Sequence, residues 1–158
     1  MTRERVAIQD LYPDDFAHCF GCGRHNARGH QLKSFVDGDD VVARFTPRAE
    51  DTALPGFVYG GLIASLIDCH AMGTAAAPPE RAAGRHIGDG PAPRFVTAAL
   101  NITFLKPTPI GGELVILGHV TERTDKKAIV DVILSANNVV TARGNVGAVP
   151  MPASMGRS

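Results

Sequence analysis

The chain has 158 residues, which is enough for one domain with a hydrophobic core and short for two. Its 16 basic and 16 acidic side chains give a formal net charge of zero, and 6% of its residues are aromatic. A neutral chain with no long basic run and few aromatic residues is not expected to bind nucleic acid. We therefore expect a single domain over residues 1–158 with no nucleic-acid partner.

The sequence also gives no sign of a membrane span or a secretion signal. The longest apolar run, over residues 61–77, is interrupted by Asp68 and His70, and the charged start at residues 2–5 leads into no signal-like apolar segment. Three cysteines, an odd number, do not suggest a disulfide framework. These features favour a soluble, cytoplasmic protein.

Local signals divide the chain into elements. Residues 1–30 are irregular and rich in His, Cys, Gly and Asn, and we expect them to pack on the domain as an arm or lid. The run 37–40 is a hairpin signal, Pro78-Pro79 stops a helix, and Asn137-Asn138 is a tight turn in which Asn readily takes positive φ. The expected elements are the arm over 1–30, strands over 31–36 and 41–46, a helix over 60–76, an inserted loop over 77–93, and strands over 94–105, 114–121, 128–136 and 139–149.

Two strands, one helix and four further strands indicate an α+β fold. An antiparallel sheet curved around one central apolar helix would bury that helix on every side once a second subunit is added. We therefore expect this architecture, with no internal repeat.

The helix over 60–76 begins with Gly60-Gly61 and carries one carboxylate, Asp68, among apolar neighbours. A buried carboxylate is costly, so it needs a partner or a function. Free backbone N–H groups at a helix start favour negative charge, and glycine lets a ligand approach closely. The structural alternative is that Asp68 only hydrogen-bonds a backbone group. At about 100° per residue, the face of Asp68 carries mostly small side chains that leave space for a substrate: Gly61, Ala64, Ser65, Ala71, Met72 and Ala75.

Gly60 and Asp68 are eight residues apart, or about 12 Å along a helix. That separation is too large for both to act on one carbonyl group. Two antiparallel copies of the helix would bring Gly60 of one subunit beside Asp68 of the other. We therefore expect a homodimer or homotetramer with composite active sites.

His70 lies two residues after Asp68, which on a helix is about 200° away, so the two are not expected to act as a pair. A core histidine bonded to the backbone or sheet is the simpler interpretation. His18, Cys19, Cys22 and His25 have the residue types of a zinc site, but four ligands within eight residues leave little chain to wrap a tetrahedron. A packed arm is the favoured alternative, and Cys69 is interpreted as a core residue.

Three blocks occur in order along the chain: residues 18–26 (HCFGCGRHN), Gly60-Gly61 with Asp68, and residues 97–109 (TAALNITFLKPTP). In this order they resemble the CxxCGxxN opening, the Gly-Gly-x6-Asp helix and the basic-Pro-x-Pro strand end of the hotdog-fold acyl-CoA thioesterases of the phenylacetic-acid-degradation type. The resemblance covers about residues 18–149. It implies a curved antiparallel sheet wrapped around one long central helix.

The resemblance also implies roles for three residues. Asp68 would be the catalytic carboxylate, either a general base toward water or a nucleophile on the thioester carbonyl. Gly60 would donate its N–H to the thioester oxygen, and Thr97 would position the attacking water. Relatives usually carry His before the Gly pair, where this chain has Tyr59, and residues 51–55 lack the amide side chain that many relatives place there.

The sequence therefore predicts an acyl-CoA thioesterase that uses no metal or redox cofactor. One alternative is an acyl-thioester dehydratase or hydratase, which needs a histidine and a carboxylate that converge. The other is a non-catalytic acyl-ligand binding module, with which Tyr59 and the missing amide are compatible. The expected catalytic residues are Asp68, Gly60 and Thr97, and the expected substrate-binding residues are Tyr59, Gly61 and Ser65.

Overall fold

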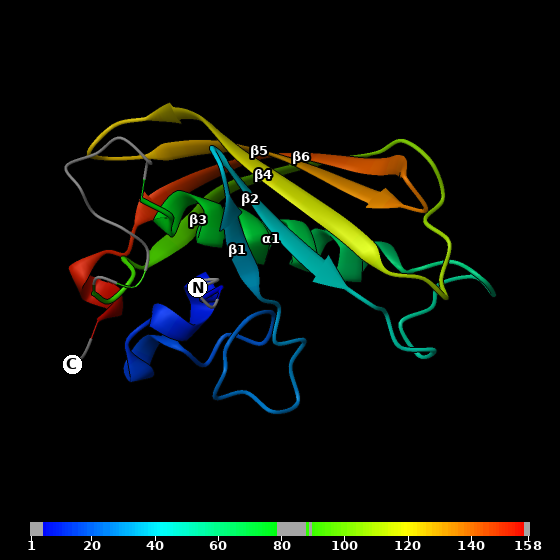
Figure 1. Cartoon of the computed structure of the whole chain (residues 1–158), viewed down its shortest axis with the longest axis horizontal. Coiled ribbons are helices and arrows are strands. Elements are labelled where there is room, and N and C mark those ends of the chain that lie inside the picture. Colours follow the sequence, from blue (N-terminus) through cyan, green and yellow to red (C-terminus); the bar gives the residue numbers. More distant parts are fainter. Residues whose placement is uncertain (1–4, 79–87, 89, 157–158) are drawn as a thin grey trace.

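The computed structural model describes residues 5–78, 88 and 90–156, and within them one long helix packs against one six-stranded sheet (Figure 1). All neighbouring strands are antiparallel, in the order β1-β2-β4-β5-β6-β3. The expected hotdog fold, a curved antiparallel sheet wrapped around one central helix, is confirmed. The elements are β1 Ser34–Asp37, β2 Asp40–Phe45, α1 Gly60–Ala76, β3 Phe95–Phe104, β4 Leu114–Arg123, β5 Ala128–Ala136 and β6 Val139–Pro150.

The turn between β5 and β6 forms as its residue types predict, and one strand begins later than expected. Asn137 and Asn138 both have positive φ, 52° and 63°, which suits the tight turn between β5 and β6. The first strand was expected from residue 31 but begins at Ser34. Gln31 has a φ of 50°, in the left-handed region, so the chain is not extended there.

The concave face of the sheet holds α1 closely because two strands carry glycine where the helix crosses them. A Cβ added at Gly118 of β4 would lie 2.3 Å from Thr74 Oγ1, and one at Gly144 of β6 would lie 2.5 Å from Ile67 Cγ2. Leu62 and Ile67 of α1 are fully buried against the sheet. The N-terminal half of α1 nevertheless keeps one uncovered stripe, which consists of exposed Gly60 and Gly61 and half-buried Ala64, Ser65 and Asp68.

The N-terminal segment lies on the opposite side of α1 from the sheet (Figure 1). It contains two short 3₁₀ helices, Ile8–Leu11 and Asp14–Phe16, that the sequence did not predict, and a third follows β6 at Ala153–Met155. Ile8, Tyr12 and Cys22 are buried, so this arm is part of the hydrophobic core.

Most of the expected loop over 77–93 falls on residues 79–87 and 89, which lie outside the described residues. In the part of the chain that is described, no helix has both the length and the apolar character needed to cross a membrane.

Candidate active site

Asp68 lies on the uncovered stripe of α1 and is half-buried. Its Oδ1 accepts a hydrogen bond from the hydroxyl of Thr97, on the edge strand β3. Burial raises the pKa of the Asp68 carboxyl above its ordinary value, whereas the Thr97 hydrogen bond and the charge of Arg94 act in the opposite direction. A partly desolvated carboxylate with a raised pKa is a better base than an exposed one.

A bulge in β3 explains why Thr97 reaches the helix. Thr97 pairs with Ala148 and Ala99 pairs with Gly147, so Ala98 is an extra residue without a partner on β6. Such bulges bend a strand and redirect the side chains beside it. The bulge therefore lets the first part of β3 turn the Thr97 hydroxyl toward Asp68.

The start of α1 offers free backbone donors. Among the described residues, the N–H groups of Gly60 and Gly61 have no hydrogen-bond acceptor, and Tyr59 at the N-cap makes no capping bond through its side chain. Free N–H groups and the positive end of the helix dipole favour an oxyanion at this position. Aromatic rings crowd the same place. A Cβ added at Gly61 would lie 2.7 Å from Tyr59 Cε2, and one at Gly60 would lie 3.4 Å from Phe104 Cζ.

The structure brings some of the expected site residues together and keeps others apart. Asp68 and Thr97 are in contact, whereas Gly60 lies two turns away on the same helix, about 12 Å along its axis. Tyr59 is 37% exposed beside Gly61. Ser65 lies against the N-terminal arm, where its Oγ would be 3.3 Å from a Cβ added at Gly21. One chain alone thus holds the two halves of the expected site at separate places.

His70 is fully buried on the sheet side of α1, away from Asp68. Its Nε2 donates to the carbonyl oxygen of Val41 at 2.9 Å, and its Nδ1 lies 2.8 Å from the Ser34 hydroxyl, which donates to it. Gln9 completes this network by donating to Ser34 Oγ at 2.9 Å. The interpretation of His70 as a core histidine is confirmed, and a dehydratase-like pairing of His70 with Asp68 is not formed.

Buried His70 predicts a loss of stability in mild acid. Burial lowers its pKa from 6.5 to about 4, so between these values the unfolded chain binds a proton that the folded chain does not. Stability is therefore complete above pH 6.5 and falls as the pH decreases toward 4. We expect about 2 kcal/mol of unfolding free energy to be lost between pH 7 and pH 5. Urea unfolding at both pH values measures this loss.

His70→Gln serves as the control for that prediction because glutamine keeps polar atoms but does not titrate. The variant should be less stable than the wild type at pH 7 and should lose much less stability on going to pH 5. An equal loss in both proteins would show that other groups cause the acid sensitivity.

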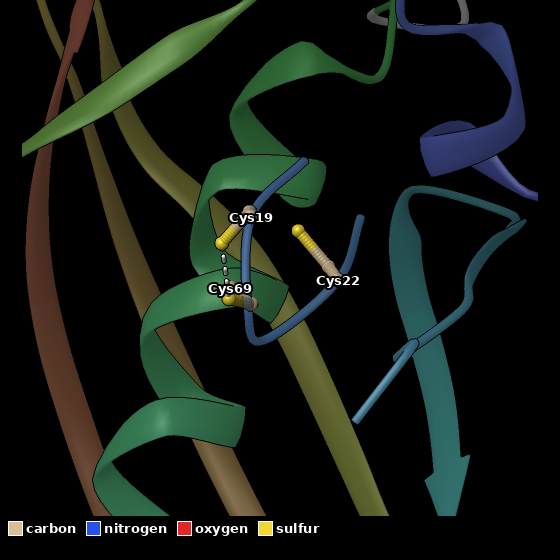
Figure 2. Close-up of side chains that lie close together, drawn as sticks. All are labelled: Cys19, Cys22 and Cys69. Carbon is tan, nitrogen blue, oxygen red and sulfur yellow. Dashed lines mark hydrogen bonds between the residues drawn. The ribbon is translucent and has the colours of Figure 1, made fainter. Parts of the chain in front are cut away.

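The three cysteines gather at one point between the arm and α1 (Figure 2). Cys19 and Cys22 come from the arm and Cys69 comes from the helix, next to Asp68; all three are free thiols whose sulfur atoms lie within 4.8 Å of one another. The sulfurs of Cys19 and Cys69 are 3.8 Å apart. The neighbouring thiols hold the pKa of Cys19 well below its usual range, and the nearby Cys19 sulfur raises the pKa of Cys22 to about 12.

This cluster differs from the four residues His18, Cys19, Cys22 and His25 that the sequence analysis considered as zinc ligands. His25 instead bonds to Asp14 with Nε2 at 2.9 Å from Oδ1, and its ring stacks near that of His18, with centroids 5.4 Å apart. Cys69, expected only as a core residue, is buried but also meets both arm cysteines. Local sequence patterns give no signal for this contact, because 50 residues separate Cys19 from Cys69.

Sequence reasoning also missed Arg94, which directly precedes β3. Its guanidinium carbon lies 4.9 Å from the centre of the Tyr12 ring, and its charge lowers the pKa of Asp68.

Comparison with known proteins identifies the family. The family profile described as "Thioesterase superfamily" matches residues 55–142, which include α1 and Thr97. The chain belongs to the thioesterase superfamily. A solved thioesterase superfamily protein from Shewanella loihica PV-4 shares 45% sequence identity with it, covering 89% of this chain and 100% of that chain, with a TM-score of 0.67.

More distant structures share the fold of this thioesterase superfamily protein. The PaaI protein from the phenylacetic acid degradation operon of E. coli is 17% identical, covering 77% of this chain and 78% of its own, with a TM-score of 0.61. The smu.793 protein of Streptococcus mutans UA159, solved bound to acetyl CoA, is 18% identical, covering 80% and 94%, with a TM-score of 0.62. No curated protein shows significant similarity to the chain.

Proposed function

We propose that the protein hydrolyses an acyl-CoA thioester to a free acid and coenzyme A. The observation that carries the proposal is the half-buried Asp68, held by Thr97 beside a stripe of small residues on α1. Family membership supports thioester hydrolysis as the reaction type. The acetyl CoA bound to the similarly folded smu.793 protein supports coenzyme A as the carrier of the acyl group.

In the proposed reaction, the Asp68 carboxylate either removes a proton from water as the water attacks the thioester carbonyl or attacks that carbonyl itself. In the first route the Thr97 hydroxyl, already bonded to Oδ1, also helps to place the water. In the second route Asp68 forms an anhydride that water then hydrolyses. Both routes release coenzyme A as the thiol and pass through a tetrahedral oxyanion that needs a donor.

The donor that we propose is the N–H of Gly60 of the partner subunit. Within one chain the free N–H groups at the start of α1 are too far from Asp68 to reach the same carbonyl. The edge strand β3 supports a partner, because within the described part of the chain its ten residues pair only with β6, and they expose Leu100 and Phe104. A second copy placed antiparallel would complete two equivalent sites.

Hydrolysis of a panel of short, medium, long and aromatic acyl-CoA thioesters tests this function. We expect release of free coenzyme A from at least one class, with kcat/KM reporting the acyl preference. Chromatography should be used to measure coenzyme A because thiol reagents would also titrate the protein's own cysteines. Binding of acyl-CoA without release would indicate a binding module. Addition or loss of water on the acyl chain would indicate a hydratase or dehydratase, a reaction that buried His70 does not favour.

A further inference from the structure

The cysteine cluster has the dimensions of a metal site and not of a disulfide. The 3.8 Å between the sulfurs of Cys19 and Cys69 compares with about 2.05 Å in a disulfide. Thiolates bound to a tetrahedral zinc ion at about 2.3 Å lie about 3.8 Å from one another. The sulfur of Cys22 lies within 4.8 Å of both others, and all three side chains converge on one space (Figure 2).

The backbone of the arm is shaped around these sulfurs. The loop that carries Cys19 and Cys22 folds back over α1, so that both arm sulfurs lie beside the sulfur of Cys69. The turn is closed by a bond from Gly23 N–H to Cys19 O at 2.7 Å. Gly21 lies directly over the helix, where an added Cβ would be 2.2 Å from Cys69 Sγ. Only glycine at that position lets the arm bring its two thiols onto the third.

One buried polar group in the same core as the cluster lacks a hydrogen-bond partner among the described residues. Tyr12 is 2% exposed, and its hydroxyl is a buried side-chain polar atom without a hydrogen-bond partner among the described residues. Tyr12 belongs to the same buried core as Cys22 and Cys69. A buried hydroxyl without a hydrogen-bond partner destabilises the fold, and the water on a bound ion would supply that partner.

We propose that Cys19, Cys22 and Cys69 bind one Zn²⁺ ion as three thiolates, with a water molecule in the fourth position that hydrogen-bonds to the Tyr12 hydroxyl. Three thiolates and one divalent cation carry a net charge of −1. Arg94, whose guanidinium lies over the Tyr12 ring, supplies a compensating positive charge. This site is separate from the proposed reaction centre and does not depend on it.

Binding at this site is an exchange of cations with no redox step. Each thiol that is protonated in the metal-free protein releases its proton to water, each sulfur keeps its electron pair and forms a bond to zinc, and no oxidant is needed. The ion would join the arm to α1 one residue from Asp68. Its expected effect is therefore structural: it fixes the arm on the catalytic helix.

Metal content of the full chain, purified and kept reduced, tests the proposal. We expect one Zn²⁺ per chain by elemental mass spectrometry, held in competition with a chromophoric chelator. Replacement by Co²⁺ should give the intense thiolate-to-metal charge-transfer absorption of a sulfur-ligated ion. Zinc should also raise the unfolding temperature. These three readouts use the wild-type protein, so they do not depend on whether any variant folds.

Substitutions of single residues test which side chains bind the zinc ion. Cys22→Ser and Cys69→Ser should each weaken zinc binding at least ~100-fold, and Tyr12→Phe, which loses only the hydroxyl, about 10-fold, in the range for outer partners of a metal site. His18→Ala is the control that should bind zinc like the wild type. A reduced wild-type chain with three free thiols by mass that takes up neither Zn²⁺ nor Co²⁺ would overturn the proposal. So would loss of zinc in His18→Ala with retention in Cys69→Ser.

Discussion

Asp68→Asn is expected to lower kcat for acyl-CoA hydrolysis by at least ~10²-fold, the usual scale for losing a general base and the minimum for losing a nucleophile. Asparagine has nearly the same shape and keeps an oxygen for the Thr97 hydroxyl, so the fold and assembly should be unchanged. Stability should be equal or higher, because burial disfavours the charged form of Asp68. Steady-state kinetics together with urea unfolding measure both effects.

Thr97→Val is the matched control for that substitution, because it removes the hydroxyl at the same contact and keeps the carboxylate. Asp68 acts only when ionised, so activity should fall as the pH drops through its raised pKa. The Thr97 hydrogen bond lowers that pKa, so in Thr97→Val the acid limb should move to higher pH. Wild-type activity in Asp68→Asn would refute the catalytic role, and severe unfolding would favour a purely structural carboxylate.

Composite sites predict recovery of activity when two inactive variants are mixed. Gly60→Pro removes the N–H donor, and Asp68→Asn removes the carboxylate, so each homodimer should be nearly inactive. In the heterodimer one site carries both lesions and the other carries none. Subunit exchange should therefore restore up to about half of the wild-type activity per heterodimer. The activity of heterodimers purified with two different affinity tags measures this recovery.

The structure indicates that Gly60→Pro can fold. Gly60 is the first residue of α1, where proline is favoured, and Tyr59 before it has φ −72° and ψ 145°, which a following proline permits. Gly60→Ala is the matched control, because it keeps the N–H and should lose less activity than Gly60→Pro. Heterodimers as inactive as their parents would place the site within one chain or exclude these residues from it.

Elements with a local signal were predicted well from the sequence. The helix over 60–76 was found with its observed bounds because Gly60-Gly61 and Pro78-Pro79 mark its ends, and β5 lies over the expected 128–136. The other strands have ends that differ from the expected ones by at most three residues, as at Ser34. The two 3₁₀ helices of the arm were missed because turns of three or four residues leave no periodic pattern.

The candidate site was only partly predictable, because its contacts join distant segments. The helix pattern singled out Asp68, but the Thr97 contact followed only from the family resemblance, since it depends on the bulge at Ala98. Tertiary packing brings Cys69 against the arm cysteines and places Arg94 over the Tyr12 ring. Neither has a signature within a short window of sequence.

Three consecutive residues of α1 contact three different parts of the molecule. Asp68 contacts β3, Cys69 contacts the arm, and His70 contacts β1 and β2. Successive helical residues point about 100° apart, so inserting or deleting one residue would turn all three away from their partners together. A one-residue insertion or deletion in this turn of α1 is therefore expected to disturb the candidate site, the cysteine cluster and the sheet contact at once.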